Sequence, residues 1–291
     1  MILNFKKIEK ADIGVLHQAL KGDTAVCDHT VGGIFLWRGW FDTHYCVLGD
    51  TLFLRARYTE DRTAFTFVGG DVINAYLTLK QYCDESGERF RLYCITIDVM
   101  EKLRTSFPEL KASAERDMFD YIYDARELSE LIGKKWNGQR NHINRFKKTY
   151  QEYSLKIIES PEDITRVREF FRYIQKTRLK DFSAAFEELE RIDEALTLFN
   201  ELGLCGAYVT VEDKVVAASL GEIVGDVLFV HVEKALVEYT GVYPMMANSF
   251  ASLFGKNVRF INREEDEGDE GLRRSKLSYH PVILKEKYVV W

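Results

Sequence analysis

The sequence predicts an α/β protein in two tandem halves, each a mixed central sheet flanked by helices. Two observations indicate this fold class. Each half has three short strands joined by tight turns, and each then continues with a helix, a strand, a helix and a strand. The three strands are expected to run antiparallel, and the strand–helix–strand steps to be right-handed crossovers. With 46% hydrophobic residues among 291, the chain can build about two domains with a sizeable core.

In the first half, turn signals and helical spacing separate the elements. Gly49 and Asp50 form a strong hairpin signal between the first two strands. Apolar residues follow one helical stripe over Val72–Cys83, and Pro108 ends the next helix. The predicted strands are His44–Val47, Leu52–Tyr58, Ala64–Val68, Phe90–Ile97 and Phe119–Tyr123, and the predicted helices are Val72–Cys83 and Met100–Phe107.

The second half repeats this order. Pro161 opens a helix, since proline is well placed in the first helical turn, and Gly203 ends the following helix. The predicted strands are Leu155–Glu159, Cys205–Val211, Val215–Ile223, Val227–Val232, Val258–Asn262 and Val282–Val290. The predicted helices are Ile164–Thr177, Phe186–Leu202, Pro244–Phe254 and Gly271–Ser278.

Charge is distributed unevenly along the chain. With 40 basic and 46 acidic residues the formal net charge is −6, which excludes a basic footprint for nucleic acid over the whole protein. Between Leu131 and Gln151, however, no acidic residue occurs. We therefore divide the chain into an N-terminal domain at 1–125, a basic helical connector at 126–152 and a C-terminal domain at 153–291.

The connector is the predicted nucleic-acid contact. Its basic side chains suit phosphates, and Trp136 suits stacking on unpaired bases such as an acceptor end. A solvated basic face is the simpler alternative, and peripheral contact with an anionic membrane is a further one. The residues assigned to nucleic-acid binding are Lys134, Lys135, Trp136, Arg140, Lys147 and Lys148.

The absence of several sequence motifs excludes some classes of protein and of catalytic site. No apolar run reaches the roughly 20 residues of a transmembrane span, and the charged start MILNFKKIEK is not a secretory signal. The five cysteines are scattered without a CxxC pair, which predicts a reducing, cytoplasmic location and no zinc site. Neither GxSxG nor HExxH occurs, so we expect neither a serine-hydrolase site nor metal catalysis, and no cofactor.

Three segments resemble a known family. They are GKKWNGQRNHINRFKK at Gly133–Lys148, HVEKALVEYTGVYPMMANSFA at His231–Ala251 and FINREEDEGDEGLRRSKLSYHP at Phe260–Pro281. They look like the hallmark segments of an uncharacterised bacterial family related to the C-terminal domain of phosphatidylglycerol lysyltransferases. This resemblance implies a tandem GNAT acyltransferase fold, similar to that domain and to the Fem-type peptidoglycan aminoacyltransferases.

The resemblance also implies a reaction. Those relatives take an aminoacyl group from a charged tRNA and pass it to an amine or hydroxyl acceptor. After Gly271, the lysyltransferases usually carry two lysines; here Lys276 stands at the first position and Ser278 at the second. Their multi-span membrane domain is also absent from this sequence. The resemblance therefore implies the fold and the type of reaction more than it implies a lipid acceptor.

Four residues are candidate catalytic groups for such a transfer. The acceptor attacks the ester directly, so the site has to hold both reactants and accept a proton. His231 and Glu233 share one face at a strand end, and Glu264 and Asp266 follow the strand Val258–Asn262. Either pair could supply a general base or bind a substrate ammonium. A structural pair and a solvated loop are the alternatives.

Four further residues are candidate substrate contacts. Arg273 and Lys276 share one face of a short helix, where they could pair with nearby carboxylates or meet a phosphate or the terminal adenosine of tRNA. Tyr243 and Asn248 flank the start of another helix. In the loop that precedes it, Tyr243 replaces a small residue of the acyl-CoA pattern and should crowd a pyrophosphate.

Three functions from different classes follow. The first is an aminoacyl-tRNA-dependent acyltransferase, with charged tRNA as donor and an amine or hydroxyl acceptor. The second is an acyl-CoA-dependent N-acetyltransferase with a decayed first domain. The third is a non-catalytic binding protein that retains the fold. We expect the active site in the second half, with the connector bordering the cleft between the halves.

Overall fold

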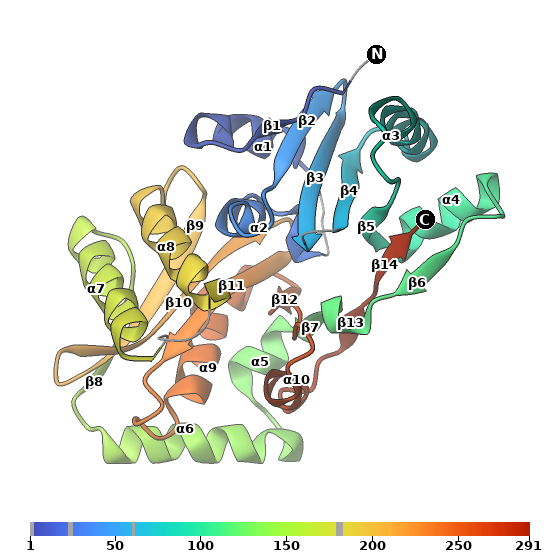
Figure 1. The fold of residues 1–291 in the computed structure, drawn as a ribbon. Coiled ribbons are helices and arrows are strands. Elements are labelled where there is room, and N and C mark those ends of the chain that lie inside the picture. The colour runs from blue at the N-terminus through green and yellow to red at the C-terminus, as the bar shows by residue number, and fades with distance from the viewer. Residues whose placement is uncertain (1–2, 23–25, 60–61, 179–182) are drawn as a thin grey trace.

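Two seven-stranded mixed sheets form the centre of the molecule, shown as a computed structural model in Figure 1. The structure describes residues 3–22, 26–59, 62–178 and 183–291. The first sheet contains, in spatial order, β1 (Lys6–Lys7), β2 (His44–Leu48), β3 (Thr51–Thr59), β4 (Arg62–Gly69), β5 (Leu92–Thr96), β14 (Lys287–Val290) and β6 (Ala112–Ala114). The second contains β13 (Ile283–Lys285), β7 (Asp120–Asp124), β12 (Phe260–Asn262), β11 (Val227–Ala235), β10 (Lys214–Val224), β9 (Leu204–Val211) and β8 (Tyr153–Ile157).

Each half has the predicted order of strands. In the first, β2, β3 and β4 are antiparallel and β4 pairs in parallel with β5. In the second, β9, β10 and β11 are antiparallel and β11 pairs in parallel with β12. The helix between the parallel strands is α3 (Val72–Ser86) in the first half and α9 (Val242–Phe254) in the second. The predicted α/β class with mixed sheets is therefore confirmed.

The other predicted helices are also present. In the first half, α4 (Ile97–Ser106) packs beside α3. In the second half, α7 (Pro161–Arg178) packs on β10 and α8 (Ser183–Thr197) packs on α7. The short helix α10 (Glu270–Leu277) follows β12. Among the described residues, no helix combines the length and the apolar composition needed to cross a bilayer.

The two sheets exchange strands, which was not expected. The strand β7 comes from the first half but lies in the second sheet, between β12 and β13. The predicted single strand Val282–Val290 is wrong: it is two strands, β13 in the second sheet and β14 in the first. Alternation of apolar residues specifies a strand but not the sheet that it joins. Division of the chain at residues 125 and 153 therefore does not coincide with the division into sheets.

The helix α2 (Val31–Trp37) lies between the two sheets and was also not predicted. Residues 31–36 are all buried, and a helix that is apolar on every side has no helical periodicity. A Cβ atom on Gly32 would lie 2.8 Å from Glu222 Oε1 and 2.9 Å from His231 Nε2. The glycine therefore lets α2 approach these two polar side chains of the second sheet closely.

The connector is helical, as predicted. It consists of α5 (Ala125–Glu130), a short 3₁₀ turn at Lys134–Trp136 and α6 (Asn137–Thr149), which lies at the bottom of the view in Figure 1. Both helices pack against α9. Ile143 and Phe146 form the buried side of α6, while the rest of the helix faces outward.

Candidate functional site

A cleft of about 910 Å³ opens beside the end of β11. The connector helix α6 contributes Gln139 and His142 to its wall. The strand β11 contributes His231 from its middle and Glu233 from nearer its end, and the loop after β12 contributes Glu264. Thus the connector borders this main cleft, and three of the four candidate catalytic residues line it.

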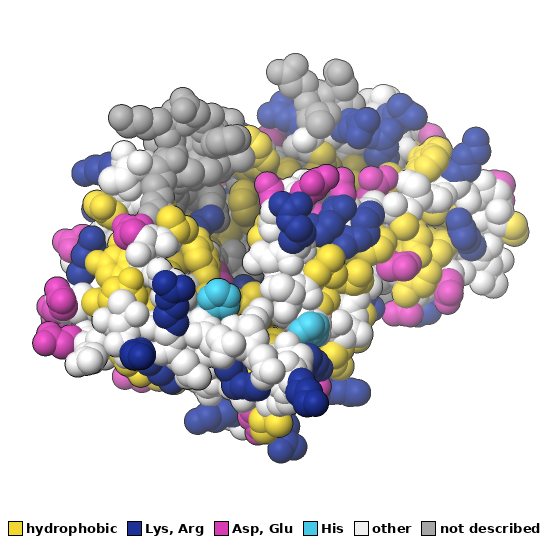
Figure 2. All heavy atoms as spheres, turned by 90° about the horizontal axis from the view of Figure 1, so that it is seen from below, with side chains coloured by type: hydrophobic (Ala, Val, Ile, Leu, Met, Phe, Trp, Pro, Cys, Tyr) yellow, Lys and Arg dark blue, Asp and Glu magenta, His cyan; other side chains and the backbone are white. Residues whose placement is uncertain are grey.

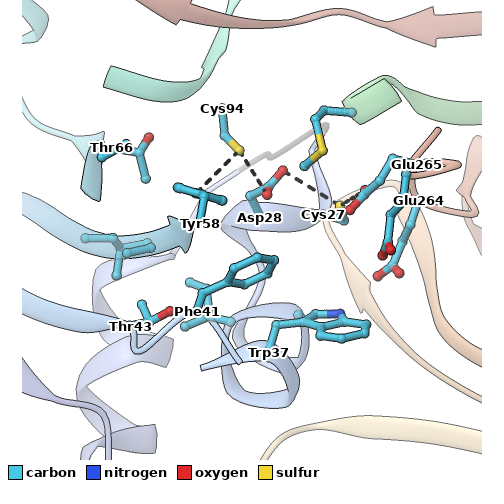
Figure 3. A pocket seen from close by; sticks show the side chains of 17 residues that line it. Cys27, Asp28, Trp37, Phe41, Thr43, Tyr58, Thr66, Cys94, Glu264 and Glu265 are labelled. Atoms are coloured by element: carbon cyan, nitrogen blue, oxygen red, sulfur yellow. Dashed lines mark hydrogen bonds between the residues drawn. The ribbon is translucent and has the colours of Figure 1, made fainter. Parts of the chain in front are cut away.

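Two further cavities continue from the main cleft toward the first sheet. One of about 70 Å³ and one of about 510 Å³ share Trp37, Glu265 and Glu267 with the main cleft. Figure 3 shows the smaller cavity, with Glu264 and Glu265 on one side and Cys94 of the first sheet on another. The three spaces therefore share part of their walls.

His231 lies between two carboxylates in the wall of the main cleft. Its Nδ1 is 2.7 Å from Glu264 Oε1, and its Nε2 is 2.8 Å from Glu222 Oε1. The same oxygen of Glu222 accepts the backbone N–H of Gly32 at 2.8 Å. Because ionised carboxylates only accept hydrogen bonds, both ring nitrogens of His231 carry protons when both partners are ionised. The imidazolium then joins β10, β11 and the loop after β12.

The environment sets the charges of these three groups. Burial lowers the pKa of His231, but the bonds to Glu222 and Glu264 outweigh it and raise the pKa to about 10. Burial raises the pKa of Glu264 to about 7, although His231 acts in the opposite direction. Burial would also raise the pKa of Glu222, but His231 lowers it overall. Glu264 is therefore the member of this group that changes charge near neutral pH.

The backbone around Glu264 is firmly held. Glu264 has a left-handed φ of 58°, which is uncommon for a residue with a side chain. Its N–H donates to Asn262 Oδ1 at 2.7 Å. On either side, the carbonyls of Arg263 and Glu265 accept hydrogen bonds from Lys276 Nζ, both at 2.5 Å. Lys276, predicted to bind substrate, is largely buried in the cleft wall and supports this loop.

Glu233 is paired within the cleft wall. Its Oε1 lies 2.8 Å from Arg263 Nη2, and the Arg263 guanidinium lies over the ring of Tyr279, 4.6 Å from its centroid. Tyr243, at the start of α9, lines the same cleft. Both carboxylates therefore have a cationic partner, but Glu264 also lines the 70 Å³ cavity and Glu233 does not.

Asp266, Arg273 and Asn248 lie outside the lining of the main cleft. Asp266 is fully buried and accepts hydrogen bonds from Arg273 Nη2 at 2.6 Å and from the Tyr121 hydroxyl at 2.5 Å. Burial opposes these contacts, yet together they hold the pKa of Asp266 well below its usual range. Asn248 donates to two carbonyls at the end of α5. The geometry gives all three residues structural contacts.

Two connector residues have partners inside the protein. Trp136 is only 1% exposed and its ring packs edge-on against His280. The expected stacking of Trp136 on a base is therefore wrong, because the indole forms part of the core beneath α6. Arg140 donates to the carbonyls of Leu131 and Gly133, and so closes the turn that follows α5.

The lysines of the connector lie at the surface. Lys135 pairs with Glu127 at 2.6 Å, whereas Lys134, Lys147 and Lys148 form no ion pair with a described residue. Figure 2, which looks at this underside, shows basic side chains spread among polar and apolar ones, and a hollow between the two halves. The available positive charge is thus dispersed along the connector.

A buried polar cluster joins the two exchanged strands, and only one feature of the sequence indicates it. Lys287 Nζ lies 2.5 Å from Asp28 Oδ2, 2.6 Å from Asp120 Oδ1 and 3.3 Å from Glu265 Oε2. Cys27 Sγ lies 3.3 Å from the same nitrogen. Burial raises the pKa of Asp120 to about 6, against the effect of Lys287. The feature of the sequence that indicates this cluster is Lys287, a lysine within an otherwise apolar final strand.

The same cluster has the donors of a metal site. Cys27, Asp28 and Asp120 could together hold one ion. However, the ammonium of Lys287 already contacts all three of these side chains. A cation is therefore supplied by the protein itself, and we assign no metal to these residues.

Comparison with known proteins identifies the family. Residues 22–291 match the family model for the phosphatidylglycerol lysyltransferase C-terminal domain. The chain belongs to this family. The resemblance indicated by the three sequence segments is thereby confirmed.

Solved structures share the fold of this lysyltransferase-family chain. A conserved protein of unknown function from Bacteroides thetaiotaomicron is 32% identical and covers 99% of both chains with a TM-score of 0.89. L-PGS from Bacillus licheniformis is 17% identical, with a TM-score of 0.68 over 98% of this chain and 92% of that one. FemX is 9% identical, with a TM-score of 0.60 over 99% and 97%. The tandem GNAT-like fold is therefore confirmed.

A curated relative from the same comparison has no assigned function. It is an uncharacterized protein of Mycoplasmoides gallisepticum, 23% identical over 205 residues. The match covers 68% of the lysyltransferase-family chain and 65% of that protein. The chain thus spans just under two thirds of this relative.

Proposed function

We propose that the protein transfers an aminoacyl group from charged tRNA to an amine or hydroxyl acceptor. The observation that carries this proposal is the placement of Glu264. Its side chain lines both the main cleft and the 70 Å³ cavity, so it lies where the spaces of the two halves meet. His231 holds its Oε1, while its Oε2 has no hydrogen bond to a described residue.

Glu264 has the properties of a general base. The nucleophilic atom of the acceptor forms a bond to the ester carbonyl carbon and gives its proton to Glu264. The bond from that carbon to the ribose oxygen of tRNA then breaks, and the departing oxygen receives the proton. A pKa of about 7 lets Glu264 both accept and return the proton. His231 and Glu222 position this carboxylate.

The start of α9 favours tRNA over acyl-CoA as donor. A Cβ atom on Gly241 would lie 2.3 Å from the carbonyl oxygen of His142, so the loop before α9 lies directly against α6. Tyr243 follows in the cleft wall. This arrangement leaves little space for the pyrophosphate that an acyl-CoA enzyme binds at a helix start. The exposed lysines Lys134 and Lys147 of the connector suit tRNA phosphates.

A transfer assay tests the proposal. Bulk tRNA charged with radiolabelled amino acids is incubated with the protein, in one arm with phosphatidylglycerol vesicles and in another with a mixture of small soluble amines. We expect label to move from RNA to acceptor, and Glu264→Gln to slow this by about 100-fold. Glu201→Gln, which changes an exposed acid outside the cleft, serves as the matched control.

Other results would point elsewhere. Thiol release from acetyl-CoA, without loss of label from RNA, would establish an acyl-CoA enzyme instead. Absence of both reactions in every arm would favour a non-catalytic binding protein. Transfer at the wild-type rate by Glu264→Gln would remove Glu264 from the chemistry.

A further inference from the structure

The cavity of about 510 Å³ lies over the face of the first sheet that α3 and α4 leave uncovered. Side chains on β14 show this division. Tyr288 and Val290 pack in the core beneath those helices, whereas Val289 and Trp291 line the cavity on the opposite face. The cavity therefore has a rigid floor of paired strands.

Three arginines line this cavity. Arg62 lies at the start of β4, and Arg89 and Arg91 come just before β5. The Phe65 N–H donates to the carbonyl of Arg91 at 2.9 Å, which brings the starts of the two strands together. None of the three guanidinium groups forms an ion pair with a residue that the structure describes.

Four acidic residues also line the cavity, and each makes contacts with other groups of the protein: Glu115, Asp117, Glu265 and Glu267. Asp117 pairs with Arg273 at 2.7 Å, and Glu265 contacts Lys287 at 3.3 Å. Glu115 accepts a hydrogen bond from a neighbouring serine hydroxyl at 3.0 Å. These acids form no ion pair with the three arginines in the part of the chain that the structure describes, and planar guanidinium groups match the geometry of phosphate oxygens.

The same cavity is lined by exposed aromatic rings. Trp40 is 41% exposed and Trp291 is 42% exposed, although both are large apolar side chains. Deeper in the cavity, the rings of Tyr58 and Tyr93 lie 4.0 Å apart. Exposed aromatic faces beside basic groups are typical of sites that stack planar bases. Rings outnumber the aliphatic side chains of Ala64, Met118 and Val289 in this lining, which favours a flat ligand over an acyl chain.

We propose that this arginine–tryptophan pocket (Arg62, Arg89, Arg91, Trp40 and Trp291) binds a nucleoside phosphate. The tryptophans would stack on the base, and the arginines would hold the phosphate. This is the combination that the connector was expected to supply, and that the burial of Trp136 excludes there. The site goes beyond the transfer reaction, since a nucleotide can bind here whether or not the chain transfers an aminoacyl group.

Titration calorimetry with AMP tests the site, with adenosine, inorganic phosphate and anionic vesicles as separate probes. We expect AMP to bind more tightly than adenosine or phosphate alone. The double variant Arg89→Gln/Arg91→Gln and the variant Trp40→Leu should each weaken AMP binding by about tenfold or more. Lys102→Gln/Arg104→Gln on α4, which removes two equally spaced charges outside the pocket, should leave it unchanged.

Two comparisons identify the source of the nucleotide and the conditions for rejection. A single-stranded trinucleotide that binds more tightly than AMP would support an RNA end, and the reverse order would support a free nucleotide-bearing molecule. Three results would overturn the proposal. They are no AMP binding at millimolar concentration, AMP binding by Arg89→Gln/Arg91→Gln as tight as that by the control Lys102→Gln/Arg104→Gln, and binding of phosphate or vesicles only. None of these results depends on the transfer assay, so the two proposals fail separately.

Discussion

Lys287 in the first sheet and Asp120 in the second form an ion pair, with 2.6 Å between Nζ and Oδ1. Each residue lies on the strand that its half contributes to the other sheet. Asp28 and Glu265 complete the surroundings of the ammonium. The pair therefore fastens both exchanged strands at one buried point between the sheets.

Replacing this lysine should destabilise the protein strongly. Lys287→Met leaves the carboxylates of Asp28, Asp120 and Glu265 close together without a cation. Loss of one partner from a buried ion pair costs about 3–5 kcal/mol. Urea unfolding followed by circular dichroism measures the change. The control Lys102→Met, at an exposed residue, should alter the free energy of unfolding by less than about 0.5 kcal/mol. An equally small effect of Lys287→Met would show that the cluster does not stabilise the fold.

The transfer rate should depend on pH through Glu264. A general base acts in its ionised form, so the rate should rise with pH and level off above about 7, the pKa of Glu264. Glu222→Gln removes one partner of His231, which frees the imidazolium to stabilise the Glu264 carboxylate and shifts the rise to lower pH. Rate profiles from pH 5 to 9 measure both effects. An unchanged profile in Glu222→Gln would assign it no positioning role.

Stability should also depend on pH through His231. Its pKa is about 10 in the folded protein, against about 6.5 in an unfolded chain. The folded state therefore binds this proton more tightly, and the stabilisation is complete below about pH 6.5 and lost as pH rises through 10. The difference in unfolding free energy between wild type and His231→Gln should shrink over that interval. A difference independent of pH would mean that the ring is neutral in the fold.

Binding of charged tRNA should depend on salt through the connector. Lys134, Lys147 and Lys148 are exposed and form no ion pair with any residue that the structure describes. If each meets a phosphate, changing all three to alanine should reduce the slope of log affinity against log salt by about 2–3. Filter binding over a salt series measures the slope. Lys80→Ala/Lys102→Ala/Lys111→Ala, a matched set of exposed lysines outside the connector, should leave the slope unchanged.

The order of elements could be predicted because it depends on local signals. The turn at Gly49, the apolar stripe of α3 and the proline start of α7 each act within a few residues. The pairing of β14 with β5 depends instead on contacts between residues almost 200 positions apart, such as Tyr288 and Ile95. The alternation of side chains is the same in either sheet, so the exchange leaves no local trace.

The candidate site was predictable only in part, for a similar reason. His231 and Glu264 could be found because His231 lies in a predicted strand and Glu264 just after another, both within family-like segments. Glu222 was not singled out, although an acid within the apolar run of β10 is unusual and requires a buried partner. Asp266 differs from Glu264 by two positions, yet its contact with Arg273 removes it from the cleft. Whether an acid meets a reactant or a cation depends on distant elements.

The reciprocal exchange of strands has a consequence for synthesis of the chain. In the first sheet, β14 is the strand between β5 and β6. The edge of β5 that faces away from β4 therefore has no partner until residue 290 has been translated. Pairings over such long separations are formed slowly. The N-terminal half therefore emerges from the ribosome with open strand edges, which invite pairing with other nascent chains.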